Sequence, residues 1–251
     1  MTAEEIIAAL NLPLASRVDQ RVPKKLLLEN GASTAADKRL INEGIEELRW
    51  LAALKPAVSG VPEFHDGERH YAEIAVLQVA LRSGAKLERL VELIHRAVPY
   101  PIWLLIDHGN DAGVSLAHKR NALNEAEKVV LDGEPVTVDL NSVRSEILAS
   151  FLSALDISRQ PRSSMYSLYQ GWMDTVFALQ AASITGVFRV LDTTELAVAR
   201  REALRASLEL QSQISSLRGA AAKASQMARQ VELNLELKKL ERELAHVREG
   251  L

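Results

Sequence analysis

Two nearly continuous apolar runs, separated by an amphipathic segment, form the clearest pattern in the first half of the chain. One run extends from Tyr71 to Leu81 and the other, "YPIWLLID", begins at Tyr100. Runs of this kind are typical of interior strands, which are buried on both faces. The segment between them carries apolar residues at helical spacing, namely Leu87, Leu90, Val91 and Ile94. This order predicts two strands of one sheet joined by a crossover helix.

Two helices are predicted before the first of these strands. The short segment "AEEIIAALNL" is followed by Pro13, which ends a helix. A longer helix is predicted over residues 33–55, with Thr34 as its N-cap and Pro56 after its end. Its apolar positions recur at three- and four-residue intervals, as Leu40, Ile41, Ile45, Leu48 and Ala52.

The region after the second strand predicts the rest of a small α/β domain. The segment "AGVSLAHKR" is predicted as a third, partly exposed strand. A short helix is predicted over "NALNEAEKVVL", and an edge strand over "EPVTVDL". We therefore expect a mixed α+β fold, with an α/β domain over residues 1–140.

Beyond residue 140 the pattern becomes helical. Residues 141–192 are predicted to pack on the α/β domain, because "MYSLYQGWMDTVFALQAASITGVF" is apolar on most sides and has Asp174 as its only charge. Residues 193–251 are predicted to form long helices with a coiled-coil segment.

The last segment carries a heptad-like seam of apolar residues, which predicts helix association. Its assembly residues are Leu210, Ile214, Leu217, Val231, Leu237, Leu240, Leu244 and Val247. Two frames of this seam are offset by two residues, so we expect a local unwinding, a kink or a change of partner near Asn234. The seam can pack as a hairpin on its own chain or act as a self-association or docking arm. The second alternative is favoured because no return helix follows the seam.

Composition limits the classes of protein that fit. The 251 residues are 47% hydrophobic and 25% charged, with a net charge of −3. No cysteine is present, which excludes disulfides, thiolate zinc sites and a cysteine nucleophile. The acidic N-terminus does not resemble a signal peptide, and no apolar run reaches the roughly 18 residues of a membrane helix. We therefore expect a cytoplasmic protein without a membrane-spanning segment.

Catalytic and metal motifs are weak. His65 and His70 do not follow a metal-ligand spacing, so no metal and no cofactor is predicted. Neither a phosphate-binding loop nor a serine elbow occurs. A divergent metal-dependent nuclease of the restriction type remains an alternative, with Glu73, Asp107 and Lys119 as its catalytic residues.

Two basic clusters are the better candidates for a binding role. The first contains Arg21, Lys24 and Lys25, and the second contains His118, Lys119 and Arg120. Such side chains suit phosphates or acidic partners. The alternative for each cluster is a solvated face or pairing with nearby acidic residues. On a strand, His118 and Arg120 share one face, whereas Lys119 points to the other.

Several segments together resemble a bacterial family catalogued as domain of unknown function 4391. They are "QRVPKKLLLEN", "TAADKRLINEGIEELRW" with "ALKP", "YAEIAVLQV", "AVPYPIWLL", "SLAHKRN" and "LYQGWMDTVFALQAASITGVF". The resemblance covers residues 12–190, and the tail from about Glu195 lies outside it. The residues marked by these motifs are Lys24, Lys25, Asp37, Lys38, Arg39, Glu73, Pro99, Tyr100, Pro101, His118, Lys119 and Arg120.

This resemblance implies an accessory protein encoded beside helicases and DNA methyltransferases in antiphage or restriction-like gene clusters. The expected function is therefore a non-catalytic accessory subunit, with a second copy of the chain, a helicase-type protein or both as partners. DNA is a further candidate partner, and a membrane is not. A purely structural coiled-coil adaptor is the remaining alternative.

Overall fold

The computed structural model describes residues 2–109, 111–123, 128–224 and 226–251, in two compact units, 1–176 and 177–251. The strands are β1 (Arg17–Arg21), β2 (Ile45–Leu54), β3 (Phe64–His65), β4 (His70–Tyr71), β5 (Ile74–Leu81), β6 (Ile102–His108), β7 (Asp111–Leu116), β8 (Lys119–Asn121), β9 (Val129–Leu131) and β10 (Val136–Asp139). The α-helices are α1 (Ala3–Leu10), α2 (Lys24–Asn30), α3 (Ala35–Gly44), α4 (Pro56–Ser59), α5 (Leu87–Ala97), α6 (Ser145–Ala154), α7 (Met165–Thr185), α8 (Thr194–Lys223) and α9 (Met227–Arg248). The mixed fold is therefore confirmed, whereas the predicted division into three regions stays a prediction.

The first unit is built on a six-stranded sheet with the order β1-β2-β5-β6-β7-β10. Only β5 and β6 pair in parallel; the other neighbouring strands are antiparallel. Helix α5 connects the parallel pair, as the two apolar runs predicted. The edge strand β10 is also confirmed.

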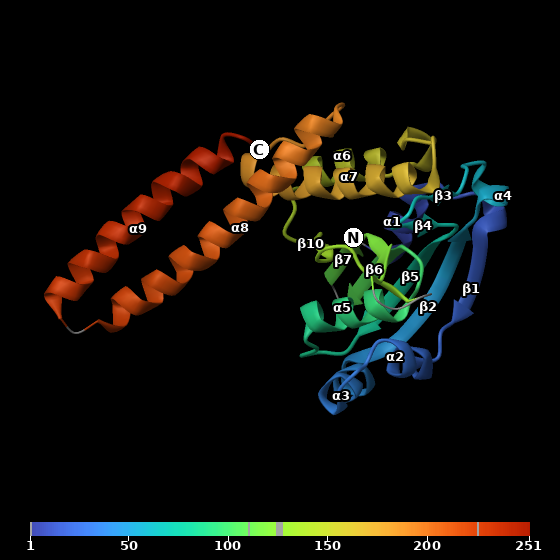
Figure 1. The fold of residues 1–251 in the computed structure, drawn as a ribbon, viewed down its shortest axis with the longest axis horizontal. Coiled ribbons are helices and arrows are strands. Elements are labelled where there is room, and N and C mark those ends of the chain that lie inside the picture. Colours follow the sequence, from blue (N-terminus) through green and yellow to red (C-terminus); the bar gives the residue numbers. More distant parts are fainter. Residues whose placement is uncertain (1, 110, 124–127, 225) are drawn as a thin grey trace. The chain divides into compact units, whose positions relative to one another are not determined.

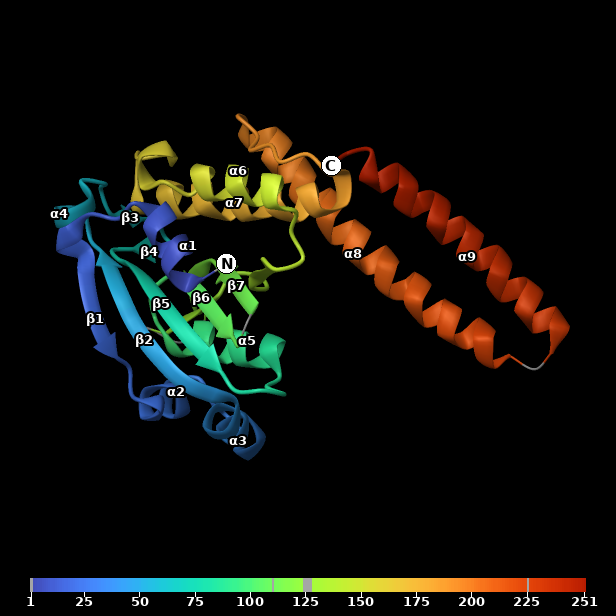
Figure 2. The same cartoon turned by 180° about the vertical axis from the view of Figure 1, so that it is seen from behind.

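Helices cover both faces of the sheet. Figures 1 and 2 show α2, α3 and α5 on one face and α1, α6 and the first part of α7 on the other. Strand residues alternate between the two layers. On β5, Leu77 and Val79 belong to the core shared with α5. Their neighbour Val76 is also fully buried, and its side chain points to the opposite face.

The long helix predicted over residues 33–55 is wrong in its second half. Helix α3 ends at Gly44, and residues 45–54 form strand β2 between β1 and β5. Its pairing with β5 shifts register twice, between Ile45 and Glu47 and between Trp50 and Ala52. Each irregularity adds a residue to one strand and resets the alternation of faces. The buried positions Ile45, Leu48, Leu51 and Leu54 are consequently three residues apart, which imitates a helical pattern.

Two further expectations are corrected between residues 111 and 131. The predicted third strand is two strands, because β7 belongs to the large sheet and β8 pairs with β9 in a separate ribbon. The end of the predicted helix 121–131 is strand β9. Residues 124–127 of that helix lie outside the described residues.

The second unit contains the antiparallel hairpin of α8 and α9. Helix α8 ends at Lys223, α9 begins at Met227, and α9 continues through Asn234 without a break. The local unwinding predicted near Asn234 is therefore wrong, and so is the expected lack of a return helix, whereas a kink or a change of partner near Asn234 stays a prediction. The seam divides unevenly: Leu210, Ile214 and Leu237 are buried, Leu217, Leu240, Leu244 and Val247 are half-buried, and Val231 is 53% exposed.

An ion pair also joins the two helices of the hairpin, with 2.7 Å between Arg218 and Glu241. The coiled coil itself stays a prediction. Within the described ranges, none of the helices has both the length and the hydrophobicity required to cross a membrane.

Candidate functional site

His118 lies in an aromatic cluster rather than on an open surface. Its ring stacks on Tyr166 at a centroid distance of 5.1 Å and meets Tyr169 edge-on at 5.3 Å. Tyr71 packs against both tyrosines, and Phe64 stacks on Tyr166. The cluster joins the β3–β4 ribbon, the segment after β7 and the first turns of α7.

Both ring nitrogens of His118 are hydrogen-bonded. Nδ1 is 2.7 Å from the Tyr71 hydroxyl, and Nε2 is 2.9 Å from Oε1 of Gln170. The amide oxygen of Gln170 can only accept, so Nε2 carries the proton and Nδ1 accepts from Tyr71. The Tyr71 hydroxyl in turn accepts the backbone N–H of Lys119 at 3.0 Å. His118 therefore links α7 to the sheet, and this arrangement leaves neither nitrogen available as a general base.

Tyr169 anchors the same helix at the start of β6. Its hydroxyl donates to the Ile102 carbonyl at 2.7 Å and accepts the Ala117 N–H at 2.8 Å. Burial raises the pKa of Tyr169 well above its usual value. The tyrosine is therefore neutral and acts as a fixed hydrogen-bonding bridge.

Lys119 is the most unusual charged residue of the segment. Its side chain is turned away from His118 and is 3% exposed. The ammonium donates to the carbonyl oxygens of His95 and Val98, the latter at 2.8 Å, at the C-terminal end of α5. A cation there is favourable for the helix dipole, but burial lowers the pKa of Lys119 to about 7. Lys119 therefore ties the end of α5 to β8, and this buried position does not suit contact with a phosphate.

The remaining basic candidates also have partners within the first unit. Arg120 is 3.9 Å from Asp132, and Lys25 is 3.6 Å from Glu29. Lys24 donates to carbonyls at the end of α3, those of Ile45 and Asn42. Burial, and after it the charges of Arg82 and Arg21, lower the pKa of Lys24. The first cluster therefore supports the α2–α3 corner, with only Arg21 and Lys25 strongly exposed.

The structure does not bring the three nuclease candidates together. Glu73 lies just before β5, 3.3 Å from Lys55. Asp107 lies near the other end of the parallel neighbour β6, where it is opposite Ala80. Ala75 and Ala80 are five residues apart along β5, which is roughly 16 Å at about 3.3 Å per residue. One metal ion cannot contact both carboxylates across that distance.

Metal ligands do not gather elsewhere in the part of the chain that the structure describes. No three His, Asp or Glu side chains there are close enough to hold a metal ion.

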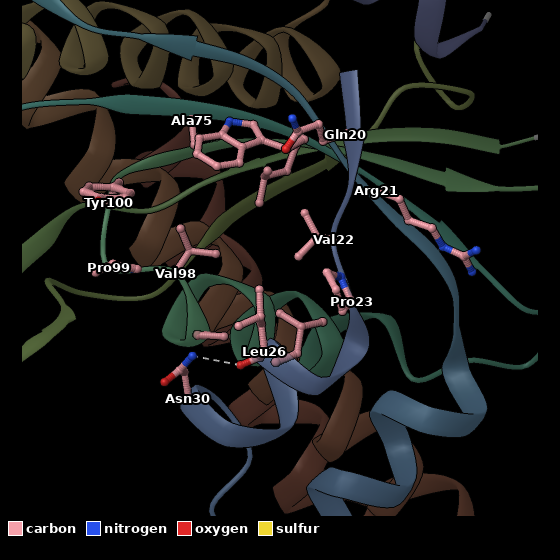
Figure 3. A pocket seen from close by; sticks show the side chains of 14 residues that line it. Gln20, Arg21, Val22, Pro23, Leu26, Asn30, Ala75, Val98, Pro99 and Tyr100 are labelled. Atoms are coloured by element: carbon pink, nitrogen blue, oxygen red, sulfur yellow. Dashed lines mark hydrogen bonds between the residues drawn. The ribbon is translucent and has the colours of Figure 1, made fainter. Parts of the chain in front are cut away.

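A cavity of about 380 Å³ opens between β1, α2 and the loop after α5. Figure 3 shows Tyr100 and Val98 on one side and Val22, Leu26 and Gln20 around the rest. The floor consists of core residues, among them Leu27 and Leu77, which are at most 3% exposed. At the mouth, Leu26 is 48% and Tyr100 is 41% exposed. A preformed, mostly apolar cavity of this size is typical of a small-molecule site.

The cavity depends on the same end of α5 that Lys119 holds. Val98 lines the cavity with its side chain and accepts the Lys119 hydrogen bond with its carbonyl. Gly31, at the end of α2, permits close packing behind this wall. A Cβ atom at Gly31 would lie 2.6 Å from the Leu93 carbonyl and 2.9 Å from the Ala97 Cβ.

Sequence reasoning missed most of the cavity. Gln20 and Trp50 face each other across β1 and β2, but the helix predicted over residues 33–55 includes Trp50, so the sequence does not predict this cross-strand pair. Tyr100 was marked by the family resemblance without a role. The exposed tyrosine beside two prolines, "PYP", was the available signal.

Residues 10–244 match the family described as Domain of unknown function (DUF4391), and the chain belongs to that family. No curated protein and no solved structure matches it. All residues that line the cavity lie in four of the segments that resemble this family, "QRVPKKLLLEN", "TAADKRLINEGIEELRW", "YAEIAVLQV" and "AVPYPIWLL".

Proposed function

We propose that the chain is a non-catalytic accessory subunit that assembles through its α8–α9 hairpin. The observation that carries this proposal is an apolar ridge on α9, consisting of Met227, Val231 and Leu235, which are 80%, 53% and 64% exposed. Their spacing of four places them along one face of the helix. Leu233 and Leu237 are buried on the face that packs against α8. Helix α9 therefore has an apolar stripe on each side.

The partner that best fits the ridge is a second copy of the chain. Glu232 and Lys239 are two helical turns apart and lie on the same flank of the ridge, on either side of Leu235. In an antiparallel pair centred near Leu235, Glu232 of each copy lies opposite Lys239 of the other. A two-fold axis repeats every contact, so one favourable pair becomes two.

This assembly is tested by sedimentation velocity at increasing protein concentration. The parent is expected to dimerise, and Val231→Asp/Leu235→Asp is expected to remain monomeric, because charges replace the apolar ridge. Leu208→Asp changes a residue of α8 that is 56% exposed and serves as the matched control. Glu232→Lys should weaken the dimer, and Glu232→Lys/Lys239→Glu should restore it. A monomeric parent would refute self-assembly through this ridge.

The family resemblance supports a more specific role for this accessory subunit, in an antiphage assembly with a helicase or methyltransferase partner. Co-purification from the native bacterium tests it. A helicase or methyltransferase is expected with the parent and with Leu208→Asp. If neither protein co-purifies with the parent, the antiphage role is contradicted. Equal retention by Val231→Asp/Leu235→Asp would mean that the partner binds without the dimer.

A further inference from the structure

The cavity beside α2 has uncharged, partly aromatic walls. Arg21 is the only charged side chain among its lining residues, and Figure 3 shows this side chain pointing away from the cavity. Trp50 and Tyr100 supply two aromatic surfaces. The indole N–H of Trp50 already donates to the Ala52 carbonyl at 2.8 Å. The ring of Trp50 is therefore fixed in place, and its contribution to a ligand is apolar contact and stacking.

Asn30 also lines the cavity, but its amide already donates to the Leu26 carbonyl at 3.0 Å. Gln20 is the uncharged polar group that remains at the mouth. It is exposed, and no hydrogen bond to its side chain is found among the described residues. Because Gln20 and Trp50 are directly opposite each other on paired antiparallel strands, their side chains lie next to each other on one face. The site thus combines an aromatic surface with a neighbouring amide that has both donors and an acceptor.

A backbone irregularity sets the direction of Gln20. The register between β1 and β2 shifts between Arg17 and Gln20, and Asp19 has a φ of 50°. Left-handed geometry is uncommon for residues other than glycine, although aspartate tolerates it better than most. Bulges of this kind redirect side chains next to binding sites. Without the shift, Gln20 would not be paired with Trp50.

We propose that this cavity binds an uncharged, planar heteroaromatic ring with a hydrogen-bonding edge, of the adenine type. The walls carry no charge directed inward, so they favour a neutral ligand over an ion. The two aromatic residues suit a flat ring, and a glutamine amide is complementary to the N6 and N7 edge of adenine. This site lies wholly in the first unit and is independent of the proposed assembly through α9.

Such a ring has two sources, a free nucleoside or nucleotide and an unstacked base of single-stranded nucleic acid. Both present the same edge and face to the cavity. They differ at the mouth, where Arg21 is directed outward and would meet the backbone phosphates of a strand.

Trp50 provides a direct measurement. The other two tryptophans, Trp103 and Trp172, are fully buried, so a soluble ligand that changes tryptophan emission acts through Trp50. Adenosine is titrated into the full chain, and its binding is measured in parallel by equilibrium dialysis. We expect saturable quenching that is lost in Trp50→Phe.

Two exposed positions give variants that are expected to fold. Gln20→Leu should weaken adenosine binding about tenfold, or about 1.4 kcal/mol, because it removes the bidentate amide–adenine pair. It should not weaken binding of naphthalene. Leu26→Phe narrows the mouth and should also weaken adenosine binding. Leu14→Phe, at a position that is 76% exposed and outside the cavity, is the matched control.

The sources are separated by comparing adenosine with a short oligo(dA). Tighter, salt-sensitive binding of the oligonucleotide that falls in Arg21→Ala assigns the ring to a nucleic-acid strand. Equal binding that is insensitive to Arg21→Ala assigns it to a free nucleoside. The proposal is overturned if adenosine does not bind, if naphthalene binds as tightly as adenosine, or if neither Gln20→Leu nor Leu26→Phe weakens adenosine binding.

Discussion

The cavity of the first unit and the ridge on α9 both present apolar side chains to solvent, but they are built in different ways. The cavity is concave; buried core residues form its floor, and the hydrogen bond from Lys119 holds Val98 in its wall. The ridge is convex and consists of one helix whose other face packs on α8. A concave, rigid surface selects a small ligand by shape, whereas a convex stripe needs a partner surface of comparable length. The two regions therefore suit different kinds of binding.

Because Lys119 holds the end of α5 that lines the cavity, the free energy of unfolding should depend on the protonation of Lys119. This is the largest effect we expect. The pKa of Lys119 is lowered from 10.5 to about 7 in the folded chain. Between these values the unfolded chain binds a proton that the folded chain does not bind. The free energy of unfolding therefore rises with pH, by about 2 kcal/mol from pH 7 to pH 9.

Urea denaturation across this range checks the effect. Lys119→Met should remove most of the rise, whereas Lys238→Met, an exposed change on α9, should keep it. Lys24, whose pKa is lowered by burial and then by Arg82, adds a rise of the same sign below pH 10.5. Buried Tyr71 and Tyr169 have raised pKa values, which lower stability only as pH increases through 10. His95, whose pKa is lowered by burial and then by Lys119, acts below pH 6.5. An equal slope in Lys119→Met and the parent would contradict the assignment to Lys119.

The strands that form the centre of the fold could be predicted from the sequence, because β5 and β6 are buried on both faces and their composition reflects it. Strand β2 could not, because two register shifts gave its buried residues a spacing of three. Local pattern does not reveal such shifts, since they arise from pairing with a distant strand.

The candidate site was harder to predict for a related reason. Lys24, Lys119 and Arg120 looked like surface contacts, but the fold uses them to satisfy carbonyls or to pair with Asp132. Val231 looked like part of a buried seam and is exposed. Residue type alone does not distinguish a charged side chain that forms hydrogen bonds or ion pairs within the fold from one that is available to a ligand.

The same substitution should have opposite effects in the two regions. Gly31→Ala should lower the free energy of unfolding by roughly 1–2 kcal/mol, because the new Cβ would meet the Leu93 carbonyl behind the cavity wall. Gly219→Ala, in α8, meets nothing within 4 Å and should gain about 0.5–1 kcal/mol through helix propensity. Thermal unfolding measures both. Gly31→Ala should also weaken adenosine binding by displacing Ala97. If Gly31→Ala changes neither the free energy of unfolding nor adenosine binding, α2 and α5 can move apart without an energetic cost.

An effect of similar size is expected at the bulge that directs Gln20, a feature with no counterpart among the described residues of the hairpin. Asp19→Ala should lower the free energy of unfolding by about 1 kcal/mol, because its φ of 50° is unfavourable for a residue with a Cβ and no local polar group. Asp19→Gly should not lower it.

Both changes at Asp19 should weaken adenosine binding, the first by strain and the second by freeing the backbone before Gln20. Asn11, with a φ of 48° at the end of α1, is the control. Asn11→Ala should cost a similar amount, partly through its lost 3.1 Å hydrogen bond to Asp156, and leave adenosine binding unchanged. If Asp19→Gly binds adenosine as the parent does, the bulge is a feature of the sheet edge alone, and the direction of Gln20 is set by Trp50.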